Sequence, residues 1–466
     1  MKIEEIEIRN FRCFESLKVT LHPNLTVLTA LNGGGKTTVL DAIRIAVWPF
    51  VKGFDIGSQA GKSATIQIGD VRIKRIYSSM EVQLPSTVAS LGTWPFQPSR
   101  DNYVWSQYRE QVKLRTNALL DKQTKELTQQ AKKVQSLIRE GKLDDQGSEF
   151  ELPVIVYLGT GRLWYQGRYT SEVEDTELDA SSQSRLWGYQ NCITATSSYK
   201  QFEKWFGWIF KSYRELQINE LEGSKTDETM LNSFKDAIAV VQGAINLLTE
   251  KETGWRDLQY RSSQNQQLVM EHSEHGFVPL SQLSDGLRNM VVMISDIAFR
   301  CYKLNPHFGK EAALRTNGIV MIDEVDMFLH PSWQQRVISS LQMAFPKIQF
   351  VVTSHSPQVL STVPAECIRI FDEGKVHSSP SGTKGAESSR ILKRIFGVDS
   401  RPQEDKNTQL LQSYEKLVYA DQWQSSAATS MREKLDEIFV GEEPKLTELD
   451  LYIENRKWEI EIEEDK

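Results

Sequence analysis

A glycine-rich segment followed by a lysine and two threonines lies near the start of the chain, and its residue types suit phosphate binding. It runs from Ala30 to Thr38 in the order Ala-Leu-Asn-Gly-Gly-Gly-Lys-Thr-Thr. Glycines let backbone N–H groups approach an anion, while Lys36 adds charge toward the β- and γ-phosphates and Thr37 offers a hydroxyl to Mg²⁺. We therefore expect a nucleotide phosphate site that consists of Asn32, Gly33, Gly34, Gly35, Lys36, Thr37 and Thr38.

Two adjacent carboxylates, Asp323 and Glu324, end the apolar run 318–322. A carboxylate at the end of a buried strand can hold Mg²⁺, and its neighbour can polarise an attacking water. We expect Asp323 to bind the metal together with Thr37, and Glu324 to act as the catalytic base. His355 follows a second apolar run and is expected to contact the γ-phosphate. The alternatives are a strand that only ends in acids and a structural histidine.

The residues around these groups predict the elements that would position them. Runs 25–29, 153–158, 318–322 and 348–353 are rich in apolar residues, which is typical of strands buried on both faces. Segment 39–47 has apolar residues at helical spacing. A strand, a glycine turn and a helix start would place N–H groups and a helix dipole around an anion. The predicted fold class is α/β.

A fourth segment, Leu-Ser-Asp-Gly-Leu-Arg at 283–288, lies between the phosphate loop and the acidic pair. The four segments in this order resemble the ABC-type ATPases of the SMC, RecF and OLD group, which are P-loop NTPases with a mixed sheet. The opening residues 6–14 resemble the first strand of that group, and 326–331 resembles the segment that faces a partner subunit. The resemblance implies ATP hydrolysis with ATP and Mg²⁺ as the bound species.

The resemblance also implies that two ATP molecules are held between two copies of the head. In this group, a serine and a glycine of the signature motif reach across a dimer to the γ-phosphate of the other subunit. Ser284 and Gly286 match these two positions. Asp285 departs from the commoner Ser-Gly-Gly-Gln pattern, and a carboxylate near phosphate would weaken binding unless it points away. A homodimer or a higher homo-oligomer is therefore expected.

The C-terminal part carries a narrower resemblance. A compact head with a short arm and a helical extension resembles PtuA, the ATPase of Septu-type antiphage systems, also found in some retron systems. The tail segment 398–405 precedes apolar residues at helical spacing, namely Leu410, Leu411, Tyr414, Leu417 and Val418. This stripe is expected to dock a partner or a second copy, or to pack on the chain's own head.

The PtuA resemblance implies a separate HNH nuclease partner, PtuB-like, in antiphage defence. In a retron setting, it also implies a reverse transcriptase and msDNA, and the sequence does not separate this setting from Septu alone. The residues after His355 hold no spaced acidic cluster of the kind that binds catalytic metals. We therefore expect no nuclease activity in this chain itself.

The spacing of the motifs predicts five regions. They are an N-terminal ATPase lobe at 1–100, a short helical arm at 101–150, a strand plus helical insertion at 151–255, a C-terminal ATPase lobe at 256–385 and a helical assembly region at 386–466. Within these regions, we expect a hairpin in 64–76 and two helices in 198–248 with a break at 223–225.

Two clusters outside the motifs have two interpretations each. Basic residues in the arm are either a solvated helix face or a DNA contact; they are Lys113, Arg115, Lys122, Lys125, Lys132, Lys133, Arg139 and Lys142. The second cluster is aromatic and basic and consists of Trp164, Tyr165, Arg168 and Tyr169. We interpret it either as a surface that stacks on nucleic-acid bases or as aromatic core or partner contacts.

The composition of the chain limits the classes of protein to which it can belong. The 466 residues carry a net charge of −7, so nucleic-acid contact would need a local patch. The four cysteines are widely spaced, which argues against a zinc or disulfide framework and suits a reducing cytoplasm. No apolar run reaches the length of a membrane span, so we expect a cytoplasmic protein without a membrane partner.

Two other functions stay open from the sequence. One is a RecF-like DNA-binding repair ATPase, and the other is a non-hydrolysing ATP-sensing scaffold. The long interval from Lys36 to Ser284 argues against a transporter subunit. The sequence does not specify the phage trigger, the nucleic acid recognised or the oligomer size. It also does not specify whether ATP activates or inhibits the complex.

Overall fold

The computed structural model describes residues 1–55, 64–96, 102–144, 147–162, 183–194, 199–262 and 266–464. Contacts divide the chain into two compact units, Met1–Ile391 and Leu392–Lys466. No helix in the described ranges is both long and apolar enough to cross a bilayer. The aromatic and basic cluster predicted at 164–169 lies outside the described residues.

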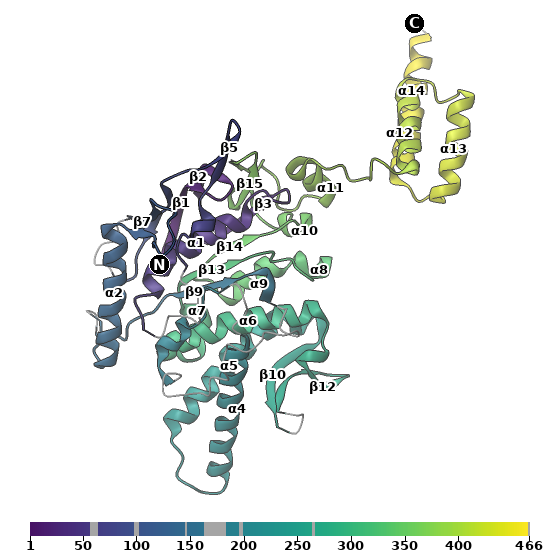
Figure 1. Ribbon diagram of the computed structural model, residues 1–466. Helices are drawn as coiled ribbons and strands as arrows, with labels where there is room; N and C mark the ends of the chain where they lie inside the picture. The colour runs from purple at the N-terminus through teal and green to yellow at the C-terminus, as the bar shows by residue number, and fades with distance from the viewer. Residues whose placement is uncertain are drawn as a thin grey trace. The chain divides into compact units, whose positions relative to one another are not determined.

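A six-stranded sheet forms the centre of the larger unit (Figure 1). Its order is β16-β15-β3-β14-β13-β9, in which the five strands from β15 to β9 are parallel and β16 is antiparallel. Strands β3, β9, β13 and β14 are buried along their whole length, which explains why they are rich in apolar residues. The predicted strands and the α/β fold class are confirmed. The strands are β3 Leu25–Ala30, β9 Val154–Leu158, β13 Gly318–Ile322, β14 Ile348–Thr353, β15 Ile368–Asp372 and β16 Lys375–Ser378.

A five-stranded antiparallel sheet forms a second layer of the same unit, with the order β2-β1-β6-β7-β8. Helix α1, Lys36–Val51, packs against strands of both sheets, so the phosphate loop before it lies where the two layers meet. Helix α2, Lys122–Arg139, packs against α1 and β7. The strands are β1 Lys2–Phe11, β2 Phe14–Thr20, β6 Ser86–Thr93, β7 Tyr103–Arg109 and β8 Leu119–Leu120.

The predicted helical arm at 101–150 is wrong in its first part, because β7 is a strand of this sheet. Its buried positions are Trp105, Gln107 and Arg109, so two of three inward side chains are polar. The Gln107 amide donates to the carbonyl of Ile45 at 2.5 Å, and the Arg109 Nε donates to that of Ile66 at 2.8 Å. Backbone carbonyls thus accept from the buried N–H donors of a strand that shows no apolar alternation.

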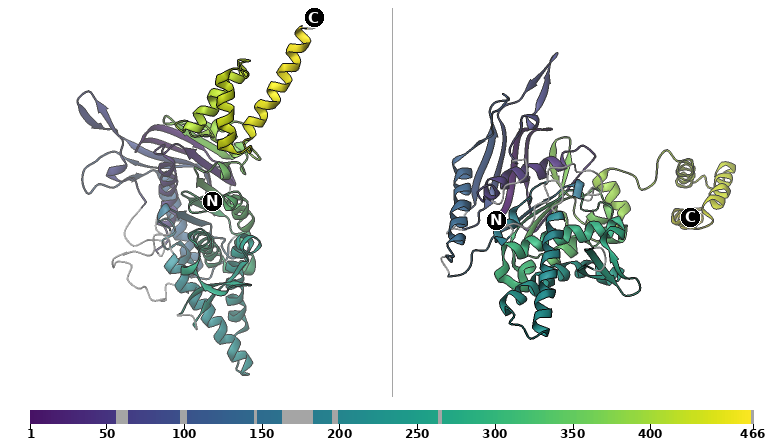
Figure 2. Two further views of the ribbon diagram at one scale, coloured as in Figure 1. Left: turned by 90° about the vertical axis from the view of Figure 1, so that its right-hand side faces the viewer. Right: turned by 60° about the horizontal axis from the view of Figure 1, so that its bottom comes forward.

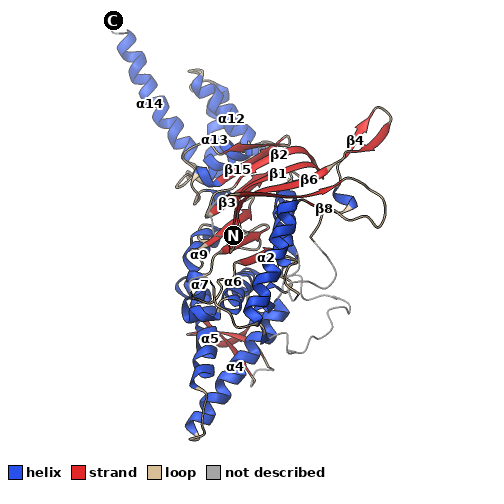
Figure 3. Cartoon of the chain, turned by 90° about the vertical axis from the view of Figure 1, so that its left-hand side faces the viewer, coloured by secondary structure: helices blue, strands red, loops and turns tan. Residues whose placement is uncertain are grey.

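The hairpin predicted at 64–76 is also displaced. Residues Ile68–Asp70 form a 3-10 turn, because the Asp70 carboxylate accepts from the backbone N–H of Gln67 at 2.8 Å. The hairpin consists of β4 Ile73–Ile76 and β5 Ser79–Val82, and all eight of its residues are exposed. It projects from the antiparallel sheet (Figures 2 and 3).

Two long helices, α4 Tyr199–Leu221 and α5 Glu228–Thr253, run side by side away from the sheets (Figure 1). This confirms the predicted pair and its break. The Asp227 carboxylate starts α5 by accepting from the N–H groups of Thr229 and Met230. A three-stranded sheet follows, and α5 then packs along α6, Asp285–Leu304. The three strands are β10 Trp255–Arg261, β11 Gln267–His272 and β12 Gly276–Pro279.

Short helical segments connect these elements. They are η3 Arg185–Tyr189, η4 Leu280–Gln282, η5 Pro306–Glu311, α7 Ala312–Arg315, α8 Pro331–Gln334, α9 Val337–Ala344, α10 Pro357–Leu360, η6 Ala365–Cys367 and α11 Ser388–Ile391.

The smaller unit is a bundle of three helices with its own apolar core. After the short η7, Leu392–Phe396, it contains α12 Lys406–Tyr419, α13 Ser426–Phe439 and α14 Pro444–Glu464. Leu411, Tyr414 and Val418 of α12 are buried against residues of the other two helices, with Leu410 and Leu417 partly buried beside them. The predicted docking stripe is therefore the bundle's internal core, which corrects the expectation that it docks a partner or packs on the head.

Candidate nucleotide site

The phosphate loop joins β3 to α1 with a backbone that requires glycine. Gly35, at the N-cap of α1, has a φ of 89°, and Gly33 has a φ of 78°. A Cβ on Gly35 would lie 2.3 Å from the Phe14 ring, so a side chain is excluded by both conformation and space. Gly35 provides no side-chain cap. The first N–H groups of α1 therefore remain available to an anion.

Lys36 is held at the loop by weak contacts. Its Nζ donates to the carbonyls of Ala30 at 3.3 Å and Leu31 at 3.4 Å. Burial lowers the pKa of Lys36, while the nearby carboxylates of Asp323 and Glu324 act in the opposite direction. Because its hydrogen bonds are long, the ammonium can exchange these carbonyls for phosphate oxygens at small cost.

The two predicted metal ligands lie side by side. The Thr37 hydroxyl donates to Asp323 Oδ2 at 3.0 Å, and the Thr353 hydroxyl donates to Oδ1 of the same carboxylate at 2.7 Å. Asp323 is 4% exposed. A hydroxyl and a carboxylate oxygen are hard donors of the kind that Mg²⁺ takes alongside substrate phosphates. The residues therefore fit Mg²⁺ bound together with ATP phosphates.

Glu324 and His355 leave the carboxyl ends of neighbouring parallel strands, β13 and β14. The backbone N–H of Glu324 donates to the Thr353 hydroxyl at 2.7 Å. Burial lowers the pKa of His355, and the nearby Lys36 lowers it further, so a neutral ring is favoured. Burial raises the pKa of Asp326, against a hydrogen bond from Ser354. Ligands of open α/β sheets bind at this strand edge.

The signature segment starts α6 and has no hydrogen bond to the phosphate loop within the described residues of the same chain. Ser284 is an exposed residue, and its hydroxyl accepts from the N–H of Leu287 at 3.4 Å. Asp285 is ion-paired with Arg288 at 2.5 Å, which neutralises the extra carboxylate. A Cβ on Gly286 would lie 2.6 Å from the carbonyl oxygen of Phe328. This glycine therefore lets α6 pack against the segment after the acidic pair.

The sequence analysis missed one buried residue of the site, Arg162. Its guanidinium is 1% exposed and donates to the backbone carbonyls of Asp323 and Glu324, both at 2.6 Å. Burial lowers the pKa of Arg162 to about 10. The available signal was Gly-Thr-Gly-Arg directly after the buried strand β9, a place where parallel strands contribute to sites.

Arg12 is a second residue that the sequence analysis passed over. Its guanidinium bridges Asp41 of α1 at 2.5 Å and Asp70 at 2.8 Å, and Arg44 pairs with the same Asp41 at 3.0 Å. These contacts fix α1, and with it the phosphate loop, to the turn between β1 and β2.

The residues of this site correspond to a known family. A family model described as an AAA ATPase domain matches residues 1–360. The chain belongs to this family. The retron Ec83 probable ATPase of Escherichia coli is 28% identical over 519 residues, which cover 100% of this chain and 89% of that protein. The retron Vc95 probable ATPase of Vibrio cholerae serotype O1 biovar El Tor is 26% identical, over 90% of this chain and 84% of that protein.

Further similarities are partial or distant. The Septu protein PtuA of Bacillus mycoides (strain KBAB4) is 39% identical over 83 residues, which cover 18% of this chain and 11% of that protein. Among solved structures, an SMC head bound to the C-winged helix domain of ScpA has a TM-score of 0.46 at 12% identity, over 82% of this chain and 98% of that chain. The resemblance to retron and Septu ATPases predicted from the sequence is confirmed.

Proposed function

We propose that this chain binds and hydrolyses ATP with Mg²⁺ as a head-to-head dimer, and that it thereby controls a separate HNH nuclease in antiphage defence. The observation that carries the ATPase part is the Thr37–Asp323 contact of 3.0 Å. It joins the phosphate loop to the acidic pair over 286 residues of sequence separation, with Lys36 and Glu324 beside it.

Each residue of the site has a role in this proposal. The loop glycines and Lys36 bind the phosphates, and Thr37 and Asp323 hold Mg²⁺, which supplies Lewis-acid stabilisation of charge on the phosphoryl oxygens when bound. Glu324 accepts a proton from water, and the neutral His355 ring donates a hydrogen bond toward the γ-phosphate. Thr353 orients both carboxylate residues, because it donates to Asp323 and accepts from the Glu324 N–H.

Exposed residues around the nucleotide site support the proposed dimer. Ser284 is exposed at the N-terminus of α6, where it can meet a phosphate of a second chain. Leu31 in the phosphate loop is 61% exposed, and Phe328 after the acidic pair is 51% exposed. Single exposed apolar residues are ordinary, but these two occur at the segments that would face a partner in the proposed dimer.

The defence role and the nuclease rest on the relatives. Two are named as retron probable ATPases and one as a Septu protein, and these names support the proposed role in a defence system of that kind. Its proposed partners are a second copy, a PtuB-like HNH nuclease and, in a retron, the reverse transcriptase with its msDNA, or DNA itself.

One experiment tests the proposal and its alternatives. The chain is purified alone and co-expressed with a PtuB-like HNH protein, and ATP hydrolysis, particle mass and co-purification are measured. We expect Mg²⁺-dependent hydrolysis, dimerisation on ATP and co-purification. ATP-dependent DNA binding without a nuclease partner would favour the repair ATPase, and ATP binding without turnover would favour the sensing scaffold.

A further inference from the structure

Arg162 connects two parts of the proposed dimer that serve different ATP sites. We infer that Arg162 is a positioning residue that couples the acidic pair of one ATP site to the signature helix α6, which serves the other site. The inference rests on the proposed function, because the trans role of Ser284 does. Its support is the contact set of Arg162, the backbone of Glu324 and the anchoring of α6.

The contacts of Arg162 reach three segments at once. Besides the carbonyls of Asp323 and Glu324, its Nη1 donates to the carbonyl of Gly159 at 3.1 Å, and its Nε donates to Asn289 Oδ1 at 2.8 Å. Asn289 lies on α6, and its own amide donates to the carbonyl of Met327 at 2.9 Å. The acidic segment is therefore fastened to α6 twice, and both links run through Asn289.

Arg162 also holds a backbone conformation that is unfavourable for glutamate. Glu324 has a φ of 50°, in the left-handed region, which costs a non-glycine residue stability unless its surroundings impose it. The surroundings act on both sides of the residue here. The Thr353 hydroxyl accepts from its N–H, and Arg162 donates to its carbonyl. The direction of the Glu324 carboxylate thus depends on the guanidinium.

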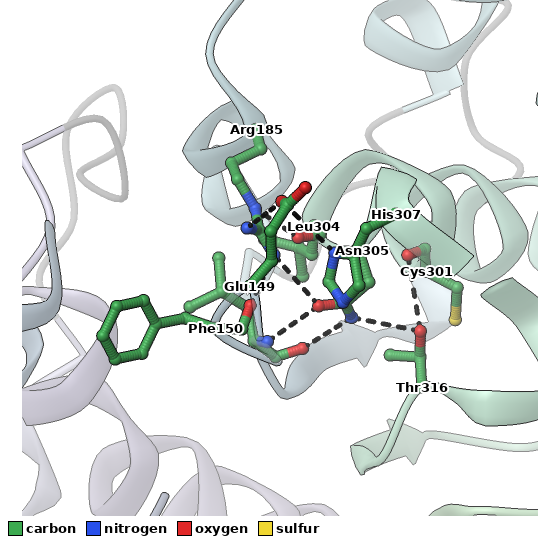
Figure 4. A network of polar contacts seen from close by, with 9 residues as sticks. Glu149, Phe150, Arg185, Cys301, Leu304, Asn305, His307 and Thr316 are labelled. Carbon is green, nitrogen blue, oxygen red and sulfur yellow. Dashed lines mark hydrogen bonds and ion pairs between the residues drawn. The ribbon is translucent and has the colours of Figure 1, made fainter. Parts of the chain in front are cut away.

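Helix α6 is anchored at its far end as well (Figure 4). The Asn305 side chain, at the C-terminal end of α6, accepts from the N–H of Leu152 at 2.8 Å and donates to its carbonyl at 2.9 Å. Arg185 donates to the carbonyls of Leu304 at 2.7 Å and Phe150 at 2.6 Å. Since 150–152 leads into β9 and Arg162 follows it, α6 and β9 are joined near both ends.

A helix tied in this way transmits a displacement of its first turn. Phosphate contact at Ser284 would shift or restrain the start of α6, and Asn289 lies little more than one turn further along. Through Asn289 and Arg162, that state reaches the Glu324 carbonyl. ATP bound at one site would thereby set the geometry of the base at the other site, so the two sites would hydrolyse ATP cooperatively.

The test is Arg162→Lys, with Arg300→Lys as the matched control. Lysine keeps the charge but is a point donor that cannot span two carbonyls and an amide. Arg300 is also fully buried, lies on α6 and donates to the backbone carbonyls of Gly188 and Gln190, away from the acidic segment. For Arg162→Lys we expect unchanged ATP affinity, a kcat lower on the order of 100-fold and a Hill coefficient near one.

A loss of ATP affinity in parallel with kcat, or an equal kcat loss in Arg300→Lys, would overturn the inference in favour of general packing. Asn289→Ala is the second variant, because it removes both links from the other side. Combined with Arg162→Lys, it should add little to the kcat loss, since the two residues act as one unit. Fully additive losses would contradict the coupling.

Hydrogen exchange separates this inference from the proposed function. ATP should slow exchange at the first turn of α6 and at 323–328 together in the wild type. In Arg162→Lys, the slowing should persist at α6 and around Met327, which stays linked to Asn289, and disappear at Asp323 and Glu324. A wild type without turnover would count against the ATPase proposal, whereas joint slowing that survives in the variant would count against the coupling.

Discussion

At the scale of single residues, the site depends on a few charged and hydroxyl groups around one carboxylate. Asp323 accepts from Thr37 and Thr353, and Arg162 fixes the carbonyl of the same residue. Lys36 supplies the positive charge at the loop. Two substitutions should separate the proposed binding of ATP from its hydrolysis.

Lys36→Ala should weaken ATP binding while the fold is retained. It removes a charge-assisted phosphate contact of about 1.5–3 kcal/mol, so the Kd should rise roughly tenfold to 100-fold or more. Calorimetric titration with ATP measures this. Lys52→Ala is the control, because Lys52 is an exposed lysine at the other end of α1. Equal affinities of Lys36→Ala and the wild type would remove the phosphate-loop assignment.

Glu324→Gln should retain ATP binding and lose hydrolysis. The amide has the same shape but cannot accept the proton of water, which lowers kcat on the order of 100-fold or more. Phosphate release and trapped nucleotide are measured side by side. Glu366→Gln, at an exposed position after β14, should behave as the wild type. Wild-type turnover in Glu324→Gln would show that another group is the base.

At the scale of elements, much of the framework around the candidate site is predictable, because buried parallel strands are rich in apolar residues and the phosphate loop has a fixed order of residues. Strand β7 was missed, since Gln107 and Arg109 face its core and hide the alternation. Arg162 was missed for a related reason. A buried arginine satisfied by main-chain carbonyls leaves no pattern in the sequence, because its partners at 323 and 324 act through backbone atoms.

Ser284 should act in trans. Mixing Lys36→Ala with Ser284→Arg chains leaves one intact composite site, because each site takes its loop from one chain and its signature from the other. ATP hydrolysis should therefore return on mixing, while each variant alone stays inactive. Subunit exchange is verified with differently tagged chains. If the verified mixture stays as inactive as the single variants, the shared site is wrong.

Phe328→Glu should block ATP-driven dimerisation without affecting ATP binding by one chain. Phe328 is half-exposed and has a φ of 63°, so its replacement removes little core packing, and it places a charge on the proposed face. Mass measurement with ATP in the Glu324→Gln background reports the dimer. Leu221→Glu, at a position 88% exposed at the end of α4, is the control. An undiminished dimer would move the interface elsewhere.

At the scale of the whole molecule, the two compact units divide the work that we propose. The larger unit contains every residue of the nucleotide site. The smaller unit, Leu392–Lys466, has a core of its own formed by α12, α13 and α14. Its outer surface, rather than the apolar stripe of α12, is then what a partner would contact.

Deleting 392–466 should leave ATP binding intact and abolish either nuclease recruitment or higher-order assembly. The measurements are nucleotide titration, co-purification with the HNH protein and particle mass. Leu411→Asp is a second variant, because a charge in the bundle core should unfold this unit alone and reproduce the deletion. Unchanged recruitment and mass in both variants would shift the partner surface to the helical insertion around α4 and α5.

The internal core of the three-helix bundle has a consequence for how such proteins diversify. The bundle buries its own apolar residues, so substitutions on its outer face can accumulate without disturbing the ATPase unit. For the same reason, the whole bundle can be exchanged between homologues as an independently packed unit. Chimeras that carry the bundle of one relative on the ATPase of another should keep turnover and acquire the effector choice of the donor. Selection can then change the partner protein that the ATPase controls, while the hydrolytic chemistry stays the same.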